Sequence, residues 1–587
     1  MKRIMIVTAG LLLSSALSPA FAQEQPAAAT PEPSTNAMVN LIRLLVQQGT
    51  ITQANGDALL QQAQGEAVQA RAASGALPAA APGTIRVPYI PETVRNQIRD
   101  EIKAEVMQQA AFEGWAAPDQ QTPGWVRNIT LSGDVRFRSQ SELFVGDNAN
   151  DIVDYARINA ASGGFDFIKN AGNIPIINTR KDRLNRLKLR ARFGASANIG
   201  KFATAAFRLA TGDDNSPIST NQNLGGGLAK RNVWLDQGYV KLMPTEWVNA
   251  SFGRFANPFR STDLLFDSDL NFDGAVVNFD AKPILPEEAR LAVHLGAFPL
   301  DFGSSDFPNT SITKKSYPAK WLLSGQIEGG YTFDGGIEFR AGAAYHYFRN
   351  VQGELSAPCL FNGANVKLAN GANDPEECST DYTRAGGLRK GNTLFFIRNN
   401  TVPLGETQKA TEKQYLGLVY KYSILDLNAS VQFPVGNLKA TIEGDYVRNL
   451  AFKRGDQCRF GAGVSPVTNV VSNNGNDNAC SASSPASVSS GNQGYLVRVG
   501  FGYPKPKRWG EWNVGASYRY LQTDAVLDSL TDSDFHLGGT NSKGYTLSGT
   551  LGLFEGVNLS ARWMSANEVS GRPLGIDVFQ FDLSAEF

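Results

Sequence analysis

Apolar and polar residues alternate one by one along most of the chain from residue 129 onward. In ITLSGDVRFR, which begins at Ile129, every second residue is apolar or Gly, and the residues between them are Thr, Ser, Asp and Arg. LKLRARFGASAN, which begins at Leu187, repeats the pattern with Lys and Arg on its polar side. The stretches GYLVRVGFGY, EWNVGASYRY, GYTLSGTLGLF and VNLSARWM follow the same rule. Alternation with a period of two predicts β-strands that have one apolar and one polar face.

The connections between these strands are alternately long and short. The segment from about 140 to 183 is long, and the strand after it ends in the short turn IGK at Ile199. If both ends of the sheet lie on the short-turn side, the pattern predicts 16 strands. One of them is a long strand over residues 413–433, in which the apolar positions change parity, and a bulge near Ser423 would explain that change.

Two architectures use strands of this kind, a soluble β-sandwich and a transmembrane β-barrel. A sandwich would bury the apolar faces in its core and expose the polar faces to water. The strands here run over 10 to 13 residues with aromatic residues near their ends, whereas the usual soluble strand has about 5 or 6 residues. A tilted strand needs about 9 to 11 residues to cross a bilayer, with Tyr and Trp at the interfaces. We therefore predict an all-β transmembrane barrel of about 16 antiparallel strands, preceded by a small α-helical periplasmic extension.

The sequence DVFQFDLSAEF at the end of the chain is a strand of the same kind. Its last residue is Phe587, and apolar side chains occur two, four, six and eight positions before it. This strand resembles the C-terminal signature of bacterial outer-membrane proteins. The resemblance implies that the barrel-assembly machinery is a partner and that Phe587 is an assembly signal.

Residues 1–22 have the features of a secretory signal peptide. An apolar run follows Lys2 and Arg3, and the sequence Ala-Phe-Ala that ends at Ala22 supplies the small residues of a cleavage site. The alternative is a membrane anchor, but a spanning helix needs about 18 or more apolar residues, and this run is shorter. We therefore expect export to the cell outer membrane, with the N-terminal extension in the periplasm.

The residues between the signal peptide and the first strand change character several times. Val94, Ile98, Ile102 and Val106 recur every four residues, which predicts an amphipathic helix. Its apolar stripe either packs against the barrel or associates with copies of itself. The expected organisation is a signal peptide (1–22), a flexible leader (23–37), a helical hairpin (38–70), a linker (71–84), an amphipathic helix with a connector (85–128) and the barrel (129–587).

The charge composition excludes one large class of function. The chain has 55 basic and 55 acidic residues, so its formal net charge at pH 7 is +0. Nucleic-acid binding normally requires a basic surplus that is concentrated on one face. We therefore expect no nucleic-acid partner.

Several stretches resemble the family of putative porins of Gram-negative bacteria. They are IRVPYIPETVRNQIRDEIKAEVMQQA from Ile85, the first strand ITLSGDVRFR, WLDQGYVKL from Trp234, and GRFANPFRSTDLLFDSDLNFDGAVVNF from Gly253. The last of these is the most specific, and the resemblance covers most of the mature chain. The resemblance implies passive diffusion of small solutes through a water-filled outer-membrane channel. By family analogy it also implies a homotrimer, and it supplies no particular substrate.

A barrel of 16 strands is too wide for its strand side chains to fill, so its polar face would line an aqueous lumen. Basic residues outnumber acidic ones on that face, where we identify Asp134, Glu328, Glu338, Glu443 and Asp445 as acids. A wall with a net positive charge would pass anions somewhat better than cations. The alternative is that the charges nearly cancel and are simply solvated. The candidate basic pore-lining residues are Arg136, Arg138, Lys188, Arg190, Arg192, Arg208, Arg340, Arg498, Arg519 and Arg562.

The stretch STDLLFDSDLNFDG falls in the third outer loop, which commonly folds inward in general porins. We expect its acids to face the arginine wall and to set a transverse field at a constriction. The same stretch reads D-x-D-x-N-x-D, but it lacks the Gly of an EF-hand and has Asn278 where that motif has Glu, so only an irregular Ca²⁺ site remains as an alternative. The candidate constriction residues are Asp263, Asp267, Asp269 and Asp273.

The four cysteines fall in two long outer loops, Cys359 and Cys378 in one, Cys458 and Cys480 in the other. Two local disulfides are the simplest of the three possible pairings. An oxidising periplasm would permit both. Because no C-x-x-C motif occurs, a zinc or redox site is not expected.

The sequence contains no recognisable catalytic motif, and we expect no enzyme activity, no metal and no cofactor. The chain has three histidines, His294, His346 and His536, of which the first two fall on the polar face and leave a barrel hydrolase as an alternative. An energised transporter is disfavoured, because the residues before the first strand are helical and low in complexity and would not form a folded plug. A structural barrel that is tethered through its periplasmic helices is the more serious alternative. The expected partners are outer-membrane lipid, small solutes and further copies of the chain.

Overall fold

The computed structural model describes residues 44–46, 51–62, 128–160, 165, 167, 170–213, 216–302, 318–355, 380–401, 411–461, 463–472 and 477–587. The chain divides into two compact units, Met1–Ala117 and Pro118–Phe587. In the first unit, residues 44–46 and 53–62 are helical, and both lie in the segment predicted as a helical hairpin. The predicted leader, linker and amphipathic helix lie outside the described residues. Among those residues, no helix is long and apolar enough to cross a membrane.

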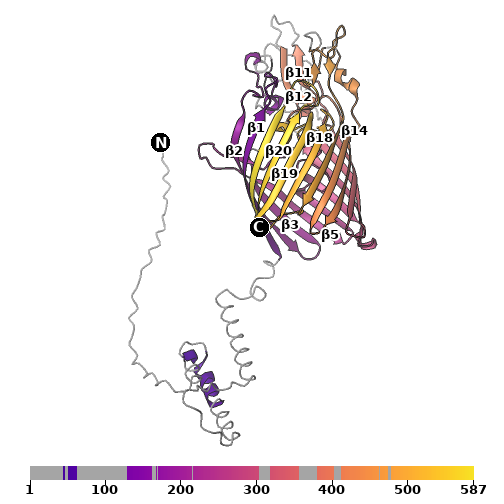
Figure 1. The fold of residues 1–587 in the computed structure, drawn as a ribbon. Coiled ribbons are helices and arrows are strands. Elements are labelled where there is room, and N and C mark those ends of the chain that lie inside the picture. Colours follow the sequence, from indigo (N-terminus) through magenta and orange to yellow (C-terminus); the bar gives the residue numbers. More distant parts are fainter. Residues whose placement is uncertain are drawn as a thin grey trace, which may run out of the picture. The chain divides into compact units, whose positions relative to one another are not determined.

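The second unit is a closed antiparallel β-barrel (Figure 1). Its sheet has 17 strands, of which β4 (Gln222–Asn223) is a two-residue addition beside β2, so 16 strands form the ring, as predicted. The ring closes where β1 pairs with β21. In ring order the strands are β1 (Ile129–Phe144), β2 (Arg183–Ile199), β3 (Ala203–Thr211), β5 (Val233–Thr245), β6 (Val248–Ala256), β7 (Asn271–Asp280), β8 (Ala289–Asp301), β9 (Lys320–Thr332), β10 (Glu338–Arg349), β13 (Tyr422–Val435), β14 (Leu438–Asn449), β17 (Gln493–Gly502), β18 (Trp512–Leu521), β19 (Ser542–Phe554), β20 (Val557–Asn567) and β21 (Ile576–Glu586).

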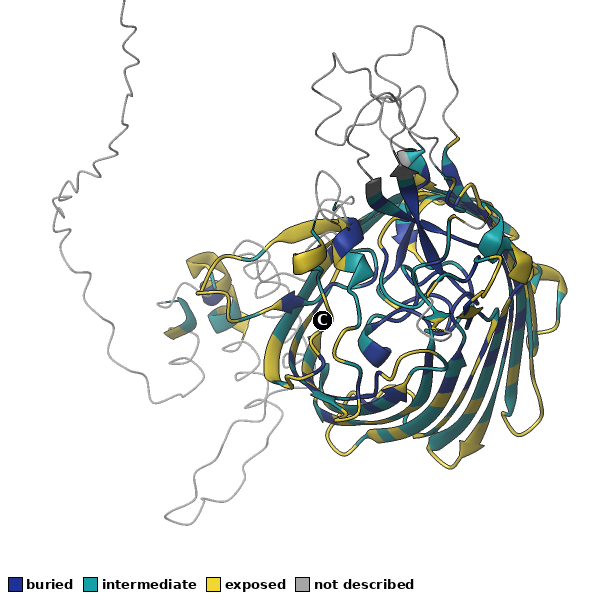
Figure 2. Cartoon of the chain, turned by 90° about the horizontal axis from the view of Figure 1, so that it is seen from above, coloured by how far each residue is buried: buried dark blue, intermediate teal, exposed yellow. Residues whose placement is uncertain are grey.

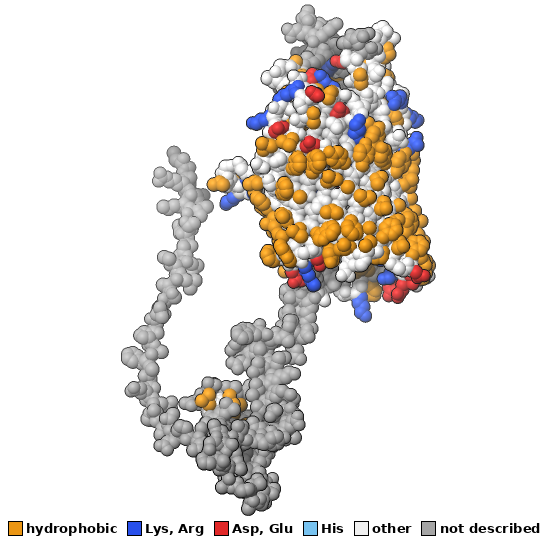
Figure 3. Space-filling model, in the orientation of Figure 1, with side chains coloured by type: hydrophobic (Ala, Val, Ile, Leu, Met, Phe, Trp, Pro, Cys, Tyr) orange, Lys and Arg blue, Asp and Glu red, His pale blue; other side chains and the backbone are white. Residues whose placement is uncertain are grey.

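The alternating pattern places apolar residues outside and polar residues inside the barrel. On β1, Val135 and Phe137 are exposed on the outer face, whereas Asp134 and Arg138 are buried on the inner face. The strands β19, β20 and β21 follow the same rule. The outward side chains form an apolar band, which Figure 3 shows on one face of the barrel. Such a band is the surface that a barrel presents to lipid.

The two ends of the barrel differ. Figure 1 shows long loops at one end and short turns at the other, where the C-terminus also lies. In outer-membrane barrels the long loops are extracellular and the short turns periplasmic. The long-loop end includes the third loop (residues 257–270), the fifth (350–421), the sixth (450–492) and the seventh (522–541).

The last residue completes the closure of the ring. The backbone N–H of Phe587 donates to the carbonyl oxygen of Gly133 at 3.0 Å, and the N–H of Gly133 donates to the carbonyl oxygen of Phe587 at 3.0 Å. A β-carbon added at Gly133 would lie 2.5 Å from Cζ of Phe587, so a larger residue could not occupy this position without displacing the ring. Closure therefore depends on a glycine in β1 opposite the terminal aromatic residue.

The predicted long strand over residues 413–433 does not exist. The stretch contains β12 (Thr411–Leu418) and the start of β13, and β12 pairs with β11 (Leu394–Thr401) in a separate hairpin of the fifth loop. The parity change is the break between β12 and β13, not a bulge at Ser423. The apolar residues Leu416, Leu418 and Tyr420 are fully buried instead of facing lipid, because the hairpin packs into the barrel.

A large apolar core lies inside the barrel at its extracellular end. It joins residues of the third, fifth and seventh loops to the inner faces of strands from β6 to β18. Figure 2, seen from above, shows these buried segments within the ring of strands. The remaining short elements belong to the loops and turns: α5 (Tyr155–Ala160), η1 (Ala171–Asn173), η2 (Lys282–Ile284), η4 (Asp381–Thr383), η5 (Arg454–Cys458), η6 (Phe535–Leu537), β15 (Val470–Val471) and β16 (Ser487–Val488).

Candidate functional site

The third loop crosses the whole interior of the barrel. It leaves the wall after β6 and reaches β18, which stands eight strands away from β6 in either direction around the ring of 16. At that far side, Nη2 of Arg519 lies 3.2 Å from Oδ2 of Asp263. The loop therefore divides the lumen at this level.

Polar contacts fix the first half of the third loop to the wall. The backbone N–H of Arg260 donates to Gln326 of β9 at 2.7 Å, and Asn428 of β13 donates to the carbonyl oxygen of Arg260 at 2.9 Å. The hydroxyl of Thr262 donates to Asp445 of β14 at 2.5 Å. Each contact uses an inward polar residue of a different strand, so the loop is held along its length.

Aromatic packing also anchors the loop on the inner faces of β7, β8 and β10. Phe266 of the third loop makes edge-to-face contacts with Phe272 of β7 and with His346 of β10, at centroid distances of 5.2 and 5.1 Å. Phe259 contacts the same histidine and Phe298 of β8, at 5.3 and 5.9 Å. Edge-to-face aromatic pairs add about 0.5–1.5 kcal/mol each to the free energy of apolar burial. The loop is therefore a packed element of the barrel interior.

Asp263 connects the third loop to two wall arginines. One of its carboxylate oxygens accepts a hydrogen bond from Arg498 of β17 at 2.6 Å, and the other lies 3.2 Å from Arg519 of β18. Burial alone would raise the pKa of Asp263, but the two guanidinium groups outweigh it and lower the pKa to about 2. Asp263 is therefore ionised at neutral pH.

Asp269 makes the equivalent connection on the other side of the loop. Its carboxylate accepts a hydrogen bond from the Thr220 hydroxyl at 3.0 Å and lies 3.7 and 3.6 Å from Arg190 and Arg192 of β2. Both arginines also contact Asp134 of β1, at 2.9 and 2.6 Å. The expected meeting of loop acids and wall arginines thus occurs through direct ion pairs at Asp263 and Asp269.

Asp267 contacts the seventh loop and not the arginine wall. Its carboxylate accepts the backbone N–H of Ser533 at 2.8 Å, and its own N–H donates to the carbonyl oxygen of Leu530 at 2.9 Å. Burial and the nearby carboxylate of Asp532 raise the pKa of Asp267 to about 8. This carboxyl group is therefore mostly protonated at pH 7.

The seventh loop supplies two functional candidates that the sequence analysis did not single out, Asp532 and Asp534. Asp532 lies 3.0 Å from Arg519. Asp534 lies 2.8 Å from Arg138 of β1 and 3.6 Å from Arg562 of β20. The acidic run TDSDF could have identified both residues, because it lies in a long connection and resembles the acidic stretch of the third loop.

Asp273 does not belong to the third loop, which corrects its prediction as a constriction residue. It lies on β7, where it follows the buried, inward Phe272, and its side chain is exposed. Its carboxylate pairs with Arg254 of β6 at 3.0 Å. Successive strand residues point to opposite faces, so this pair lies on the outer face of the barrel.

The other predicted pore-lining residues lie on inner faces of the strands. Arg136 donates to Asn221 at 2.7 Å, and Arg208 donates to Asp236 of β5 at 2.6 Å. Arg340 pairs with Glu338 on its own strand. Lys188 is half-buried on β2. Among the described residues, most predicted basic side chains thus have an acidic partner, which the alternation of single strands could not reveal.

A cavity of about 680 Å³ remains between the third and seventh loops and the strand wall. It is bordered by six basic side chains and six acidic ones among the described residues. The basic ones are Arg136, Arg138, Arg190, Lys439, Arg498 and Arg562, and the acidic ones are Asp263, Asp267, Asp269, Asp532, Asp534 and Asp582. Its polar lining makes the cavity a candidate passage for water and hydrophilic solutes.

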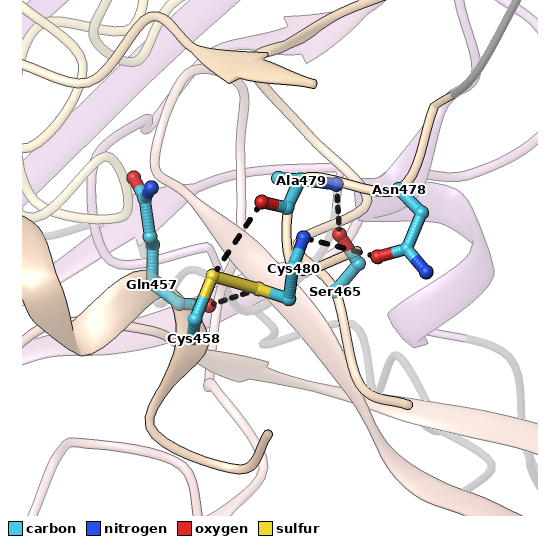
Figure 4. The surroundings of a disulfide bond; sticks show 6 residues. All are labelled: Gln457, Cys458, Ser465, Asn478, Ala479 and Cys480. Atoms are coloured by element: carbon cyan, nitrogen blue, oxygen red, sulfur yellow. Dashed lines mark hydrogen bonds between the residues drawn. A yellow bond between two sulfur atoms is a disulfide. The ribbon is translucent and has the colours of Figure 1, made fainter. Parts of the chain in front are cut away.

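The structure contains the expected disulfide between Cys458 and Cys480 in the sixth loop, with a Cα–Cα distance of 5.3 Å (Figure 4). Neighbouring backbone groups are held by side chains, because the N–H of Cys480 donates to Asn478 at 3.0 Å and the N–H of Ala479 donates to Ser465 at 2.7 Å. The other predicted pair, Cys359 and Cys378, lies outside the described residues.

The histidines do not form a recognisable hydrolytic site. His346 contacts the Ser324 hydroxyl at 2.8 Å, but both side chains are buried, and the histidine lies between the rings of Phe259 and Phe266. His294 contacts Asn278 at 2.7 Å. No group of three or more His, Cys, Asp or Glu side chains in the described part of the chain is arranged to hold a metal ion.

The sequence matches the family model described as putative porin over residues 35–587. A search of curated proteins found no match.

Among solved structures, the chain is similar to the high-pH structure of OprB from Pseudomonas putida, with 10% identity, a TM-score of 0.38, and coverage of 79% of this chain and 95% of that one. It is also similar to the outer-membrane channel DcaP of Acinetobacter baumannii, with 10% identity, a TM-score of 0.33, and coverage of 78% of this chain and 97% of that one. A third similar structure is the trimer form of OmpT, an outer-membrane protein of Vibrio cholerae, with 8% identity, a TM-score of 0.33, and coverage of 78% of this chain and 99% of that one. The family model covers nearly the whole chain and the barrel has the architecture that the family implies, so this protein belongs to the putative porin family of the outer membrane.

Proposed function

We propose that the protein is a passive diffusion channel for small hydrophilic solutes and ions. The observation that carries this proposal is the polar cavity of about 680 Å³ that the third and seventh loops leave against the strand wall. A barrel of 16 strands encloses a space that its side chains cannot fill, and here the inward loops narrow that space without removing it. Membership of the porin family supports the same function.

We further propose a mild preference for anions. The side chains of Arg498 and Arg562 are 40% and 41% exposed, whereas those of their partners Asp263 and Asp534 are 34% and 18% exposed. Asp267 is mostly protonated at pH 7, because its pKa is raised to about 8. The acidic side chains that border the cavity therefore do not offset the six basic ones, and a solute meets more guanidinium than carboxylate surface.

Planar-bilayer recording on the purified protein tests both proposals. We expect discrete conductance steps in symmetric KCl, and a reversal potential of the sign for anion preference in a salt gradient. Arg498→Gln combined with Arg562→Gln should shift the reversal potential toward cation preference. Arg254→Gln is the matched control, because this arginine lies on the outer face and should leave selectivity unchanged. Cation preference in the unaltered protein would overturn the anion proposal.

The structural tether remains the second candidate, because helical residues precede the barrel. The same recordings distinguish the two, since a tether need not conduct. Three further proposals rest on the sequence and on family analogy: removal of residues 1–22 as a signal peptide, recognition of Phe587 by the assembly machinery, and a trimer. N-terminal sequencing, assembly of a Phe587→Ala variant, and chemical cross-linking in membranes test them in turn.

A further inference from the structure

Four basic side chains gather on the outside of the barrel at its extracellular end. Arg349 ends β10, Lys421 precedes β13, Arg448 lies near the end of β14, and Lys453 follows that strand in the sixth loop. All four are exposed. Within the described residues, none of them has a carboxylate oxygen within 4.0 Å. We call these four residues the basic rim patch.

The strand register brings the members of this patch together. Phe348 pairs with Tyr422, so Arg349 and Lys421, the residues next to them, are neighbours at the end of the β10–β13 ladder. Asn449, which follows Arg448, donates from its side chain to the carbonyl oxygen of Lys421 at 2.9 Å. The patch therefore spans three adjacent strands, β10, β13 and β14.

Aromatic and apolar residues lie directly below the patch on the same outer face. Tyr345 and Tyr347 of β10 are both exposed, and the Tyr446 hydroxyl of β14 donates to Gln493 at 3.2 Å. Further down, Leu427 and Ile442 are exposed on the surface that faces lipid. Tyrosines at the end of an apolar band mark the level where hydrocarbon gives way to lipid headgroups. The four cations thus stand at headgroup height.

The patch differs from the basic residues elsewhere in the barrel. Inside, Arg138, Arg190 and Arg519 each contact a carboxylate at 3.0 Å or less. On the outer face of β6, Arg254 is paired with Asp273. Where β1 meets β21, the corresponding outward residues are Ser141 and Asp577, not cations. The basic rim patch therefore brings four such cations together at adjacent strands, whereas the other exposed cations of this end, such as Lys181 and Lys230, lie in the loops near β2 and β5.

We propose that the basic rim patch binds the phosphate groups of an anionic lipid in the outer leaflet. The charges are complementary, and the acyl chains of such a lipid would lie on the apolar strand surface directly below. A free anionic solute would gain only the electrostatic part of this interaction. The proposal concerns the outer surface and does not depend on conduction through the lumen.

Titration of the detergent-solubilised protein with lipid A that carries two phosphates, read by native mass spectrometry, tests the proposal. Each exposed cation near an anionic lipid surface contributes about 1 kcal/mol, or about a fivefold change in affinity. Arg349→Gln combined with Lys421→Gln should therefore weaken binding about 25-fold at low salt. Arg254→Gln is the matched control and should bind as the unaltered protein does. The mobility of the folded barrel on unheated gels should be the same in all three proteins, which shows that each is folded.

Two comparisons separate the lipid from other ligands. Lipid A without phosphates should bind the unaltered protein much more weakly, and inorganic phosphate at millimolar concentration should not displace the phosphorylated lipid. Equal binding of the two lipids, displacement by inorganic phosphate, or unchanged affinity of the double variant would each overturn the proposal. The pair Arg448→Gln and Lys453→Gln repeats the test on the other side of the patch.

Discussion

Asp263 and Arg519 lie 3.2 Å apart, although the loop that carries Asp263 starts from β6 and Arg519 belongs to β18, on the opposite side of the ring. A direct contact between opposite walls requires a loop that runs through the lumen. Thr531 of the seventh loop reinforces the contact, because its hydroxyl donates to the carbonyl oxygens of Asp263 and Leu264 at 3.1 and 3.0 Å. The width of the passage therefore depends on how firmly this contact holds.

Asp263→Asn should loosen the third loop and make the passage more selective for anions. Arg498 and Arg519 would both lose a carboxylate partner, so positive charge at the cavity would increase. We expect a larger single-channel conductance and a reversal potential shifted toward anion preference. Asp273→Asn, which removes an outer-face acid from the next strand, is the matched control. Equal behaviour of the two variants would contradict the assignment of Asp263 to the constriction.

The contact between the third and seventh loops should weaken as pH rises. The pKa of Asp267 is raised from 3.8 to about 8, so above its ordinary pKa the folded protein holds a proton that the unfolded chain releases. The stabilising contribution is therefore fully present below about pH 4 and is lost as pH rises through about 8. The ionised carboxylate would then repel Asp532 and Asp534.

Current fluctuations recorded between pH 6 and 9 check this prediction. We expect more frequent transitions and less anion preference above pH 8 in the unaltered protein. In Asp267→Asn, which cannot ionise at this position, both changes should be much smaller. A pH response that persists in the variant would assign the effect to another group.

The aromatic anchor of the third loop should contribute strongly to stability. Phe266 is fully buried against Phe272 and His346. Phe266→Ala should lower the free energy of unfolding by about 3–5 kcal/mol through lost contacts and an internal cavity. Phe581→Ala on the outer face should cost less, because lipid chains can refill the space. Denaturant unfolding in lipid vesicles compares the two variants.

Reduction of the Cys458–Cys480 disulfide should affect the sixth loop and leave the strand wall intact. The bond closes a loop with a sequence separation of 22 residues, and the chain-entropy model gives it about 3 kcal/mol of stabilisation. We expect faster proteolysis within the sixth loop after reduction, with no change in the mobility of the folded barrel on unheated gels. Cleavage at the same rate before and after reduction would show that other contacts hold the loop.

Much of the barrel could be predicted from sequence because each strand meets two different environments. On β1, the inward Arg138 and the outward Phe137 are adjacent residues, and a sheet between water and lipid keeps that alternation along strands long enough to cross the bilayer. The number of strands could be predicted because long and short connections alternate along the chain.

The loops could not be predicted in the same way. Leu416 and Leu418 alternate like lipid-facing residues, but they are buried inside the barrel, since alternation does not say which apolar environment a face meets. The misplacement of Asp273 has a related cause. The strand β7 begins at Asn271, inside the stretch expected to be loop, so Asp273 belongs to a strand and lies on its outward face. The contact of Asp534 with Arg138 could not be predicted either, because Arg138 lies on β1, far away in the chain.

The apolar core inside the extracellular end supports only part of the ring, the strands from β6 to β18. On the remaining side, β20 and β21 pack on a much smaller apolar cluster around Phe535 of the seventh loop, and β1 is joined to that loop by the ion pair Arg138–Asp534. The barrel is thus stiff along one arc and more compliant along the other. Lateral tension in the membrane would be taken up first by the compliant arc, so we expect the bore to respond to bilayer stretch through movement of these strands alone.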